Sequence, residues 1–262
     1  RRYGIPTPDR TGGSHRRYGL ASMSELRELR DEIAAGRRAR DAAEVIRRRA
    51  LEAAPGSDHV TEILSAALAF DPETIRTSLD LAHASLGLET TIQSVVLPVM
   101  REVGAMWEAG RCDVANEHLA SQEVRTWLSR HAYVTAEARA RKPVVLACGP
   151  NDFHSLGLEA FHVLLARRGL RCRVLGSQTP TKALLNAVDS SRAAAVVVTS
   201  HMNTNRRTAI ESIRAIADLA GVEVFYAGNA FVSRRSRQGV PGRYLGDDLA
   251  GAADLLEEAL AS

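Results

Sequence analysis

The sequence predicts a multidomain chain: a basic amino-terminal segment, then an all-α helical bundle, then a doubly wound parallel α/β sheet. Three observations lead to this fold class. Residues 1–50 hold 13 arginines against 7 acidic residues, whereas the rest of the chain has a slight acidic excess. The apolar spacing then becomes helical, and after Pro143 short apolar runs alternate with helical stretches. We therefore expect three domains, at residues 1–52, 56–139 and 142–262.

The composition excludes several classes of protein. Hydrophobic residues make up 45% and charged residues 25% of the 262 residues, as in ordinary globular proteins. No apolar run approaches the ~20 residues of a membrane helix, so we expect no membrane partner and a bacterial cytoplasmic location. The cysteines are odd in number and lack C-x-x-C spacing, which disfavours a disulfide framework or a structural zinc site.

Four helices with short turns are expected between residues 56 and 139, and this pattern is typical of an antiparallel four-helix bundle. Asp71 precedes Pro72 as a helix cap does, and Asp113 occupies the same position before the last helix, after a stop at Gly110. The apolar stripe of the first helix follows the i, i+3, i+4 rule at Val60, Ile63, Leu64, Ala67 and Leu68.

The carboxy-terminal third predicts a parallel sheet with helices on both faces. Fully apolar strands that alternate with helices are the signature of this Rossmann-like fold, which binds ligands at the carboxyl ends of its strands. The expected strands are residues 144–148, 172–175, 194–199 and 222–227, and the expected helices are residues 157–168, 182–190, 206–219 and 247–260.

The loop after the first predicted strand contains Asp152, His154 and Gly157. Asp152 lies close enough in sequence to accept the second ring N–H of His154. Such a carboxylate fixes the imidazole tautomer and makes the other ring nitrogen more basic, as it does in metal-bound histidines. Gly157 allows the following helix to begin close to a bulky group.

This D-x-H-x-x-G pattern resembles the signature of cobalamin-binding domains. The resemblance implies that His154 is the lower axial ligand of cobalt, tuned by Asp152. The dimethylbenzimidazole tail then lies in the sheet, in the base-off/His-on state, with Gly157 beside it.

The loops after the other strands carry further parts of the same resemblance. Ser200 with Met202 is similar to the family's S-x-L motif, with Met in place of Leu, and Gly228 stands where the family has Gly-Gly. Gly176 and Thr179 match the loop after the second strand. By resemblance, these residues bind the nucleotide tail, with one glycine, Gly228, where the family has two.

The bundle contains Trp107, nine residues and then Glu117-His118. This spacing resembles the W-x9-E-H motif of the CarH/LitR-type B12 photoreceptors of the MerR family, where it encloses the adenosyl group of adenosylcobalamin. Adenosylcobalamin is therefore the expected cofactor. In well-described members a histidine that captures cobalt after photolysis follows the tryptophan. This chain has Glu108 there, so that position supplies no nitrogen ligand, although His118 or water is a candidate substitute.

Residues 1–18 resemble the wing of MerR-type DNA-binding domains, and residues 24–49 resemble the helical pair that follows it. The resemblance places the phosphate-contacting residues in the wing; they are Arg10, His15, Arg16, Arg17 and Tyr18. The sequence begins inside such an element and not at a methionine. We therefore expect the helix-turn-helix to lie before residue 1 of a longer protein.

Together, these resemblances imply a regulator and not an enzyme. The expected protein is a light-responsive transcriptional regulator, of the repressor type, with operator DNA and further copies of itself as partners, in a dimer or tetramer. Two alternatives stay open: a corrinoid carrier of a methyltransferase system, and a regulator that senses cobalamin without light.

Overall fold

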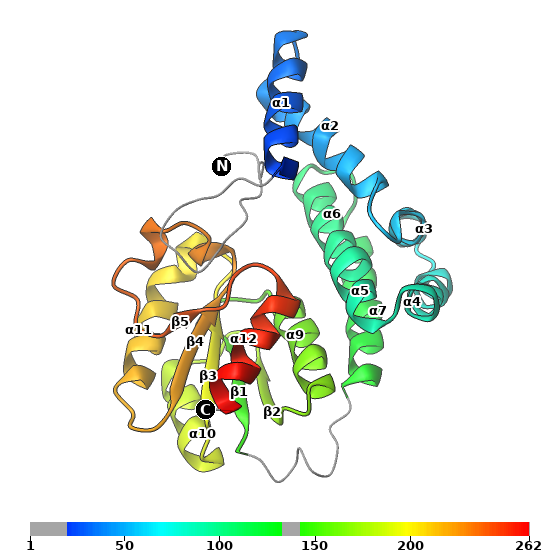
Figure 1. The fold of residues 1–262 in the computed structure, drawn as a ribbon. Helices are drawn as coiled ribbons and strands as arrows, with labels where there is room; N and C mark the ends of the chain where they lie inside the picture. Colours follow the sequence, from blue (N-terminus) through cyan, green and yellow to red (C-terminus); the bar gives the residue numbers. More distant parts are fainter. Residues whose placement is uncertain (1–19, 133–141, 262) are drawn as a thin grey trace.

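The structure is a computed structural model that describes residues 20–132 and 142–261. The expected DNA-contacting residues 10 and 15–18 therefore lie outside the described residues. The first described elements are α1 (Leu20–Ala34) and α2 (Ala39–Glu52), a helical pair that projects from the rest of the chain (Figure 1). Leu29 of α1 packs against the buried Ala43 and Ile46 of α2.

A bundle of helices follows, as predicted. Asp71 caps its second helix by accepting the N–H groups of Glu73 and Thr74, and Asp113 forms a capping box with Asn116 at its last helix. The elements are α3 (Ser57–Leu68), α4 (Pro72–Leu86), α5 (Leu88–Thr91), the π-helical turn η1 (Ile92–Val96), α6 (Leu97–Glu108) and α7 (Val114–His131).

The third helix of the bundle is interrupted by one π-helical turn. The N–H of Leu97 donates to the carbonyl of Ile92, five residues earlier, where an α-helix would bond four residues back. Pro98 follows immediately and has no N–H to donate, so the regular α-helical ladder is already broken at this point. The turn also keeps Val95 and Val96 buried in the core.

The sheet has five parallel strands in the order β2-β1-β3-β4-β5, which confirms the doubly wound fold. Only β5 has no counterpart in the sequence prediction, because two residues give no periodic signal. The strands are β1 (Val144–Cys148), β2 (Cys172–Gly176), β3 (Ala195–Thr199), β4 (Glu223–Ala227) and β5 (Arg243–Tyr244).

Helices cover both faces of this sheet (Figure 1). One face packs with α9 (Leu156–Arg167), α12 (Leu249–Ala261) and the bundle in a single continuous core. The other face packs with α10 (Thr181–Ser191) and α11 (Arg206–Ala217) in a separate core. Because the bundle shares the first core, its position relative to the sheet is set by apolar burial.

Polar contacts reinforce the contact between the bundle and the sheet domain. The guanidinium of Arg125 in α7 lies 3.1 Å from the carboxylate of Glu159 in α9. Gln93 in the π-helical turn donates to the carboxylate of Asp248, just before α12. Among the described residues, no helix has the length and apolar character required to cross a membrane.

Candidate functional site

The predicted site residues of the sheet domain gather at one edge of the sheet. The strand order reverses between β1 and β3, because the chain runs from β1 to one neighbour, β2, and then to the other, β3. At such a switch point the loops diverge and leave a crevice for a ligand. The loop after β1 carries Asp152 and His154, the loop after β3 carries Ser200 and His201, and the turn after β4 carries Gly228.

Asp152 and His154 form the pair that the sequence predicts. Nδ1 of His154 lies 2.9 Å from Oδ1 of Asp152, and the backbone N–H of His154 donates to the same oxygen at 3.1 Å. The other oxygen, Oδ2, accepts the backbone N–H of His201. Asp152 is only 1% exposed, whereas the side chain of His154 is 50% exposed.

The protonation of this pair follows from its hydrogen bonds. Burial alone would raise the pKa of the Asp152 carboxyl group. Hydrogen bonds from the N–H of His201 and from His154 outweigh burial and hold that pKa below its ordinary value. The carboxylate is therefore ionised at neutral pH and accepts a hydrogen bond from Nδ1 of His154. We assign the N–H of His154 to Nδ1, which leaves the lone pair of Nε2 available to an electrophile.

A second imidazole lies against the first, and the sequence prediction gave it no role. The rings of His154 and His201 are stacked, with centroids 4.4 Å apart and planes 25° from parallel. The amide nitrogen of Asn229 lies 3.2 Å from the ring nitrogens of His201. The signal in the sequence was a histidine two residues after the end of β3, a strand that pairs with β1.

Ser200 and Gly228 lie against each other below these loops. Ser200 is fully buried, and its N–H donates to the carbonyl of Ala227 at 3.1 Å. Gly228 has φ +104°, and a Cβ atom there would collide with the backbone of Ser200. The requirement for glycine at this position therefore has a cause within the fold, independent of any ligand.

The remaining predicted residues of this domain border open space or support a loop. A Cβ atom at Gly157 or Gly176 would meet no other atom within 4 Å. Thr179 is buried, and its N–H donates to the carbonyl of Cys148 at 3.2 Å, which ties the loop after β2 to the end of β1.

The predicted bundle residues gather where α6 ends and α7 begins. Trp107 is 52% exposed in the last turn of α6. In the first turn of α7, Nδ1 of His118 lies 2.6 Å from one carboxylate oxygen of Glu117, and the other oxygen accepts the hydroxyl of Ser121. An exposed indole, a carboxylate and an imidazole are thus available at one end of the bundle.

This end of the bundle influences the loop after β3 electrostatically. Partial burial lowers the pKa of His201, and the neighbouring His154 lowers it further. The carboxylates of Asp152 and Glu108 act in the opposite direction. Glu108 is the last residue of α6, so the end of this helix lies near enough to His201 for its charge to act on the imidazole.

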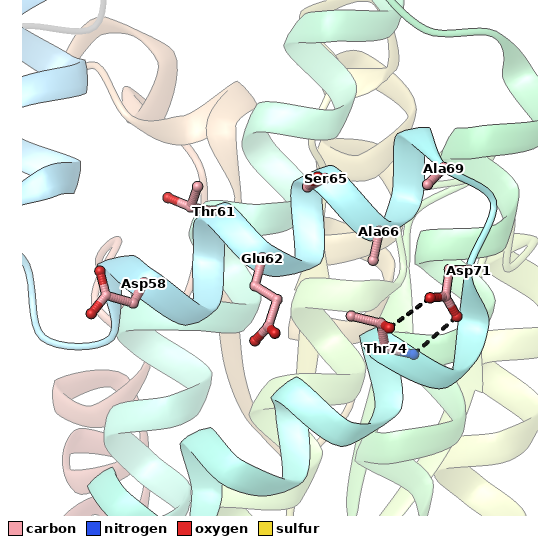
Figure 2. A pocket seen from close by; sticks show the side chains of 8 residues that line it. All are labelled: Asp58, Thr61, Glu62, Ser65, Ala66, Ala69, Asp71 and Thr74. Atoms are coloured by element: carbon pink, nitrogen blue, oxygen red, sulfur yellow. Dashed lines mark hydrogen bonds between the residues drawn. The ribbon is translucent and has the colours of Figure 1, made fainter.

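A pocket between α3 and α4 is separate from these groups (Figure 2). It contains none of the predicted site residues, and its Asp71 is occupied as the cap of α4, with Thr74 donating from both its N–H and its hydroxyl. Its lining consists of Asp58, Thr61, Glu62, Ser65, Ala66, Ala69, Asp71 and Thr74.

Comparisons with known proteins match two parts of the chain to family models. One family model, described as a B12 binding domain, matches residues 60–130, and a second with the same description matches residues 142–256. The chain also shares its fold with the monomethylamine corrinoid protein of Methanosarcina barkeri, at a TM-score of 0.59 and 15% identity, over 77% of this chain and 96% of that one.

Two curated relatives are transcriptional repressors of Myxococcus xanthus. The chain is 34% identical over 202 residues to the HTH-type transcriptional repressor CarH, covering 72% of this chain and 67% of the relative. It is 30% identical over 190 residues to the HTH-type transcriptional repressor CarA, covering 71% and 64%. The chain thus spans about two thirds of the length of these relatives, neither of which is named as an enzyme. It belongs to the family of CarH-type transcriptional regulators that carry B12-binding domains.

Proposed function

We propose that this chain is the sensory part of a light-responsive repressor that binds adenosylcobalamin in the base-off/His-on state. His154 is the lower cobalt ligand. The observation that carries the proposal is the Asp152–His154 pair at the switch point of the sheet, because a buried carboxylate holds a half-exposed imidazole with one nitrogen free.

The residues around this pair fit a corrinoid with a nucleotide tail. The free Nε2 of His154 supplies the neutral imidazole nitrogen that cobalt accepts. The space beside Gly157 at the start of α9 is open, so a bulky group can approach the backbone there. Thr179 and Ser200 are buried in the loops after β2 and β3, the two strands that flank β1, where a tail inserted into the sheet would meet them.

The bundle supplies the groups for the upper face. We assign Trp107, Glu117 and His118 to the adenosyl group: the indole packs against the base, and the carboxylate and imidazole hydrogen-bond to the sugar. When bound, the cofactor supplies a cobalt–carbon bond that visible light breaks. Glu108 places a carboxylate at the end of α6, so this position offers no imidazole after illumination.

The same contacts explain how light would alter assembly. A bound group stabilises the protein conformation that it contacts best, and loss of the adenosyl group removes that stabilisation from the bundle. We propose that the dark protein is a dimer or tetramer on operator DNA and that illumination dissociates it. Assembly matters because several weak DNA contacts combine into one strong interaction.

The test is an absorption spectrum with adenosylcobalamin in the dark and again after green illumination, with the mass of both samples determined in solution. The proposal expects a histidine-ligated spectrum that changes with light, together with a change in mass. Binding without a light-dependent change in mass would contradict the light response and leave a cobalamin sensor or a corrinoid carrier. Methyl transfer from methylcobalamin to a partner, without operator binding, would identify the carrier.

A single substitution tests the ligand assignment. His154→Ala removes the imidazole that Asp152 holds, so the bound cofactor should lose its axial nitrogen and bind more weakly. The matched control is His59→Ala in α3, which removes a histidine of the bundle. An unchanged spectrum and affinity in His154→Ala would contradict the assignment.

A further inference from the structure

We propose that His201 is a positioning residue for His154: the stacked His201 ring holds the His154 imidazole in the orientation that presents Nε2 to cobalt. This inference rests on the proposed function, because it concerns how the proposed cobalt ligand is oriented. No sequence motif discussed above assigns a role to His201.

Asp152 alone holds only one end of the His154 ring. Its carboxylate fixes the position of Nδ1 of His154 through one hydrogen bond of 2.9 Å. A single hydrogen bond leaves the imidazole free to tilt about the line from Nδ1 to the carboxylate oxygen. Such a tilt moves Nε2, which is the atom that must meet the cobalt.

The stack removes this freedom. The ring of His201 covers one face of His154, with centroids 4.4 Å apart and planes 25° from parallel. A tilt of His154 toward His201 would produce a clash, and a tilt away would lose the ring contact. The hydrogen bond and the stack together fix the direction of the lone pair on Nε2 before a cofactor binds.

His201 is itself held from two sides, so it can act as a support. Its backbone N–H donates to Oδ2 of Asp152, the same carboxylate that binds His154. Asn229, from the turn after β4, lies with its amide nitrogen 3.2 Å from the His201 ring. The support therefore connects the ends of β1, β3 and β4.

The stacked arrangement also indicates which of the two histidines is the cobalt ligand. Two stacked rings cannot both place a nitrogen at the single axial position below a cobalt ion, so only one of them can be the ligand. His154 is the ring whose Nδ1 is bound by the carboxylate. In this arrangement His154 is the ligand, and His201 lies beside it.

The test compares His201→Ala, His201→Phe and the control His59→Ala in the intact chain. Cobalamin affinity is measured by titration in the dark. Axial nitrogen is measured in the Co(II) form by electron paramagnetic resonance, since a coordinated nitrogen splits the cobalt hyperfine lines. In His201→Ala the His154 ring is no longer held in place before the cofactor binds. Cobalamin affinity should therefore fall by about three- to tenfold, and a smaller fraction of the bound Co(II) should carry an axial nitrogen. His201→Phe keeps a stacking ring and should restore both, and His59→Ala should match the unsubstituted chain.

Several results would overturn the inference. Equal affinity and equal nitrogen splitting in His201→Ala would show that the stack is dispensable. Failure of His201→Phe to restore either, with the fold intact by circular dichroism, would show that an imidazole nitrogen matters and not a ring. Nitrogen splitting that survives in His154→Ala but disappears in His154→Ala/His201→Ala would make His201 a ligand. If the unsubstituted chain shows no axial nitrogen at all, the proposed function itself is contradicted, whatever the His201 variants show.

Discussion

Gly228 lies directly against the backbone of Ser200, so closely that a Cβ atom at Gly228 would collide with the Ser200 carbonyl group. The contact joins the turn after β4 to the buried end of β3. Because Gly228 also has φ +104°, Gly228→Ala adds both a collision and an unfavourable backbone angle. We expect it to lower the free energy of unfolding by about 2–4 kcal/mol, measured by urea denaturation.

The control is Gly239→Ala. Gly239 has φ +70°, but a Cβ atom there would meet nothing within 4 Å, so only the backbone angle carries a cost, of about 1 kcal/mol. Equal destabilisation in the two variants would contradict the role of the Ser200 contact.

Gly157→Ala should separate stability from cofactor binding. Gly157 lies in the first turn of α9 with open space around it, so alanine adds helix propensity without a clash. We expect a chain more stable by about 0.5–1 kcal/mol in denaturation experiments. Cobalamin affinity should fall, because the added methyl group occupies space assigned to the nucleotide tail. Unchanged affinity would remove Gly157 from the proposed site.

Asp152→Asn should make the stability of the chain less dependent on pH. The pKa of Asp152 is lower in the folded chain than its ordinary value of 3.8, so the unfolded chain takes up this proton first as the pH falls. The stabilisation by the carboxylate is therefore complete at pH 7 and is lost as the pH falls through the folded pKa.

The amide has one acceptor oxygen for the N–H groups of His154 and His201, so we expect a loss of about 1–3 kcal/mol at pH 7. Urea denaturation at several pH values measures the gap between the variant and the unsubstituted chain. A gap that stays constant down to pH 3 would contradict the role of the ionised carboxylate.

Thiol labelling should distinguish the three free cysteines. Burial raises the pKa of Cys148 to about 11 and that of Cys172 to about 12, so neither forms a thiolate near pH 8 in the folded chain. Cys112 is only partly buried and should react first with Ellman's reagent. The other two should react only as the chain unfolds, and Cys112→Ser should remove the fast phase. Rapid labelling of Cys148 would show that the loop after β1 does not bury this cysteine as described.

Alanine substitution of the two tryptophans should affect different properties, the light response at Trp107 and the stability of the fold at Trp127. Trp107 is 52% exposed, so Trp107→Ala should change stability by less than about 0.5 kcal/mol while impairing the light-driven change in mass more than cobalamin binding. Trp127 is fully buried and donates its indole N–H to Asp80 at 2.9 Å, so Trp127→Ala should cost about 3–5 kcal/mol. An intact light response in Trp107→Ala would contradict the proposed adenosyl contact.

Local signals explain which parts of this structure could be predicted. Asp71 and Asp113 were predictable caps, because a cap depends only on residues two or three positions away. Asp152 and His154 were predictable as a pair for the same reason. The stacking of His201 on His154 was not, since it joins two loops whose relation depends on the strand order.

The boundaries of the three predicted domains and the roles assigned to the site residues stay predictions. So do the DNA contacts assigned to residues 10 and 15–18, which lie outside the described residues. The effect of Glu108 on His201 was also invisible in the sequence, because it depends on how the bundle docks on the sheet. Apolar patterning predicts the helical bundle and the sheet domain, but it does not predict which end of the bundle lies near which loops of the sheet domain.

The π-helical turn at Ile92–Val96 sets the rotational phase of everything that follows it in the helix. A π turn contains one more residue than the α turn it replaces. If the same residues formed a regular α-helix instead, Trp107 and Glu108 would be rotated by about 100° about the helix axis. The direction in which the end of α6 presents these two side chains therefore depends on the π turn.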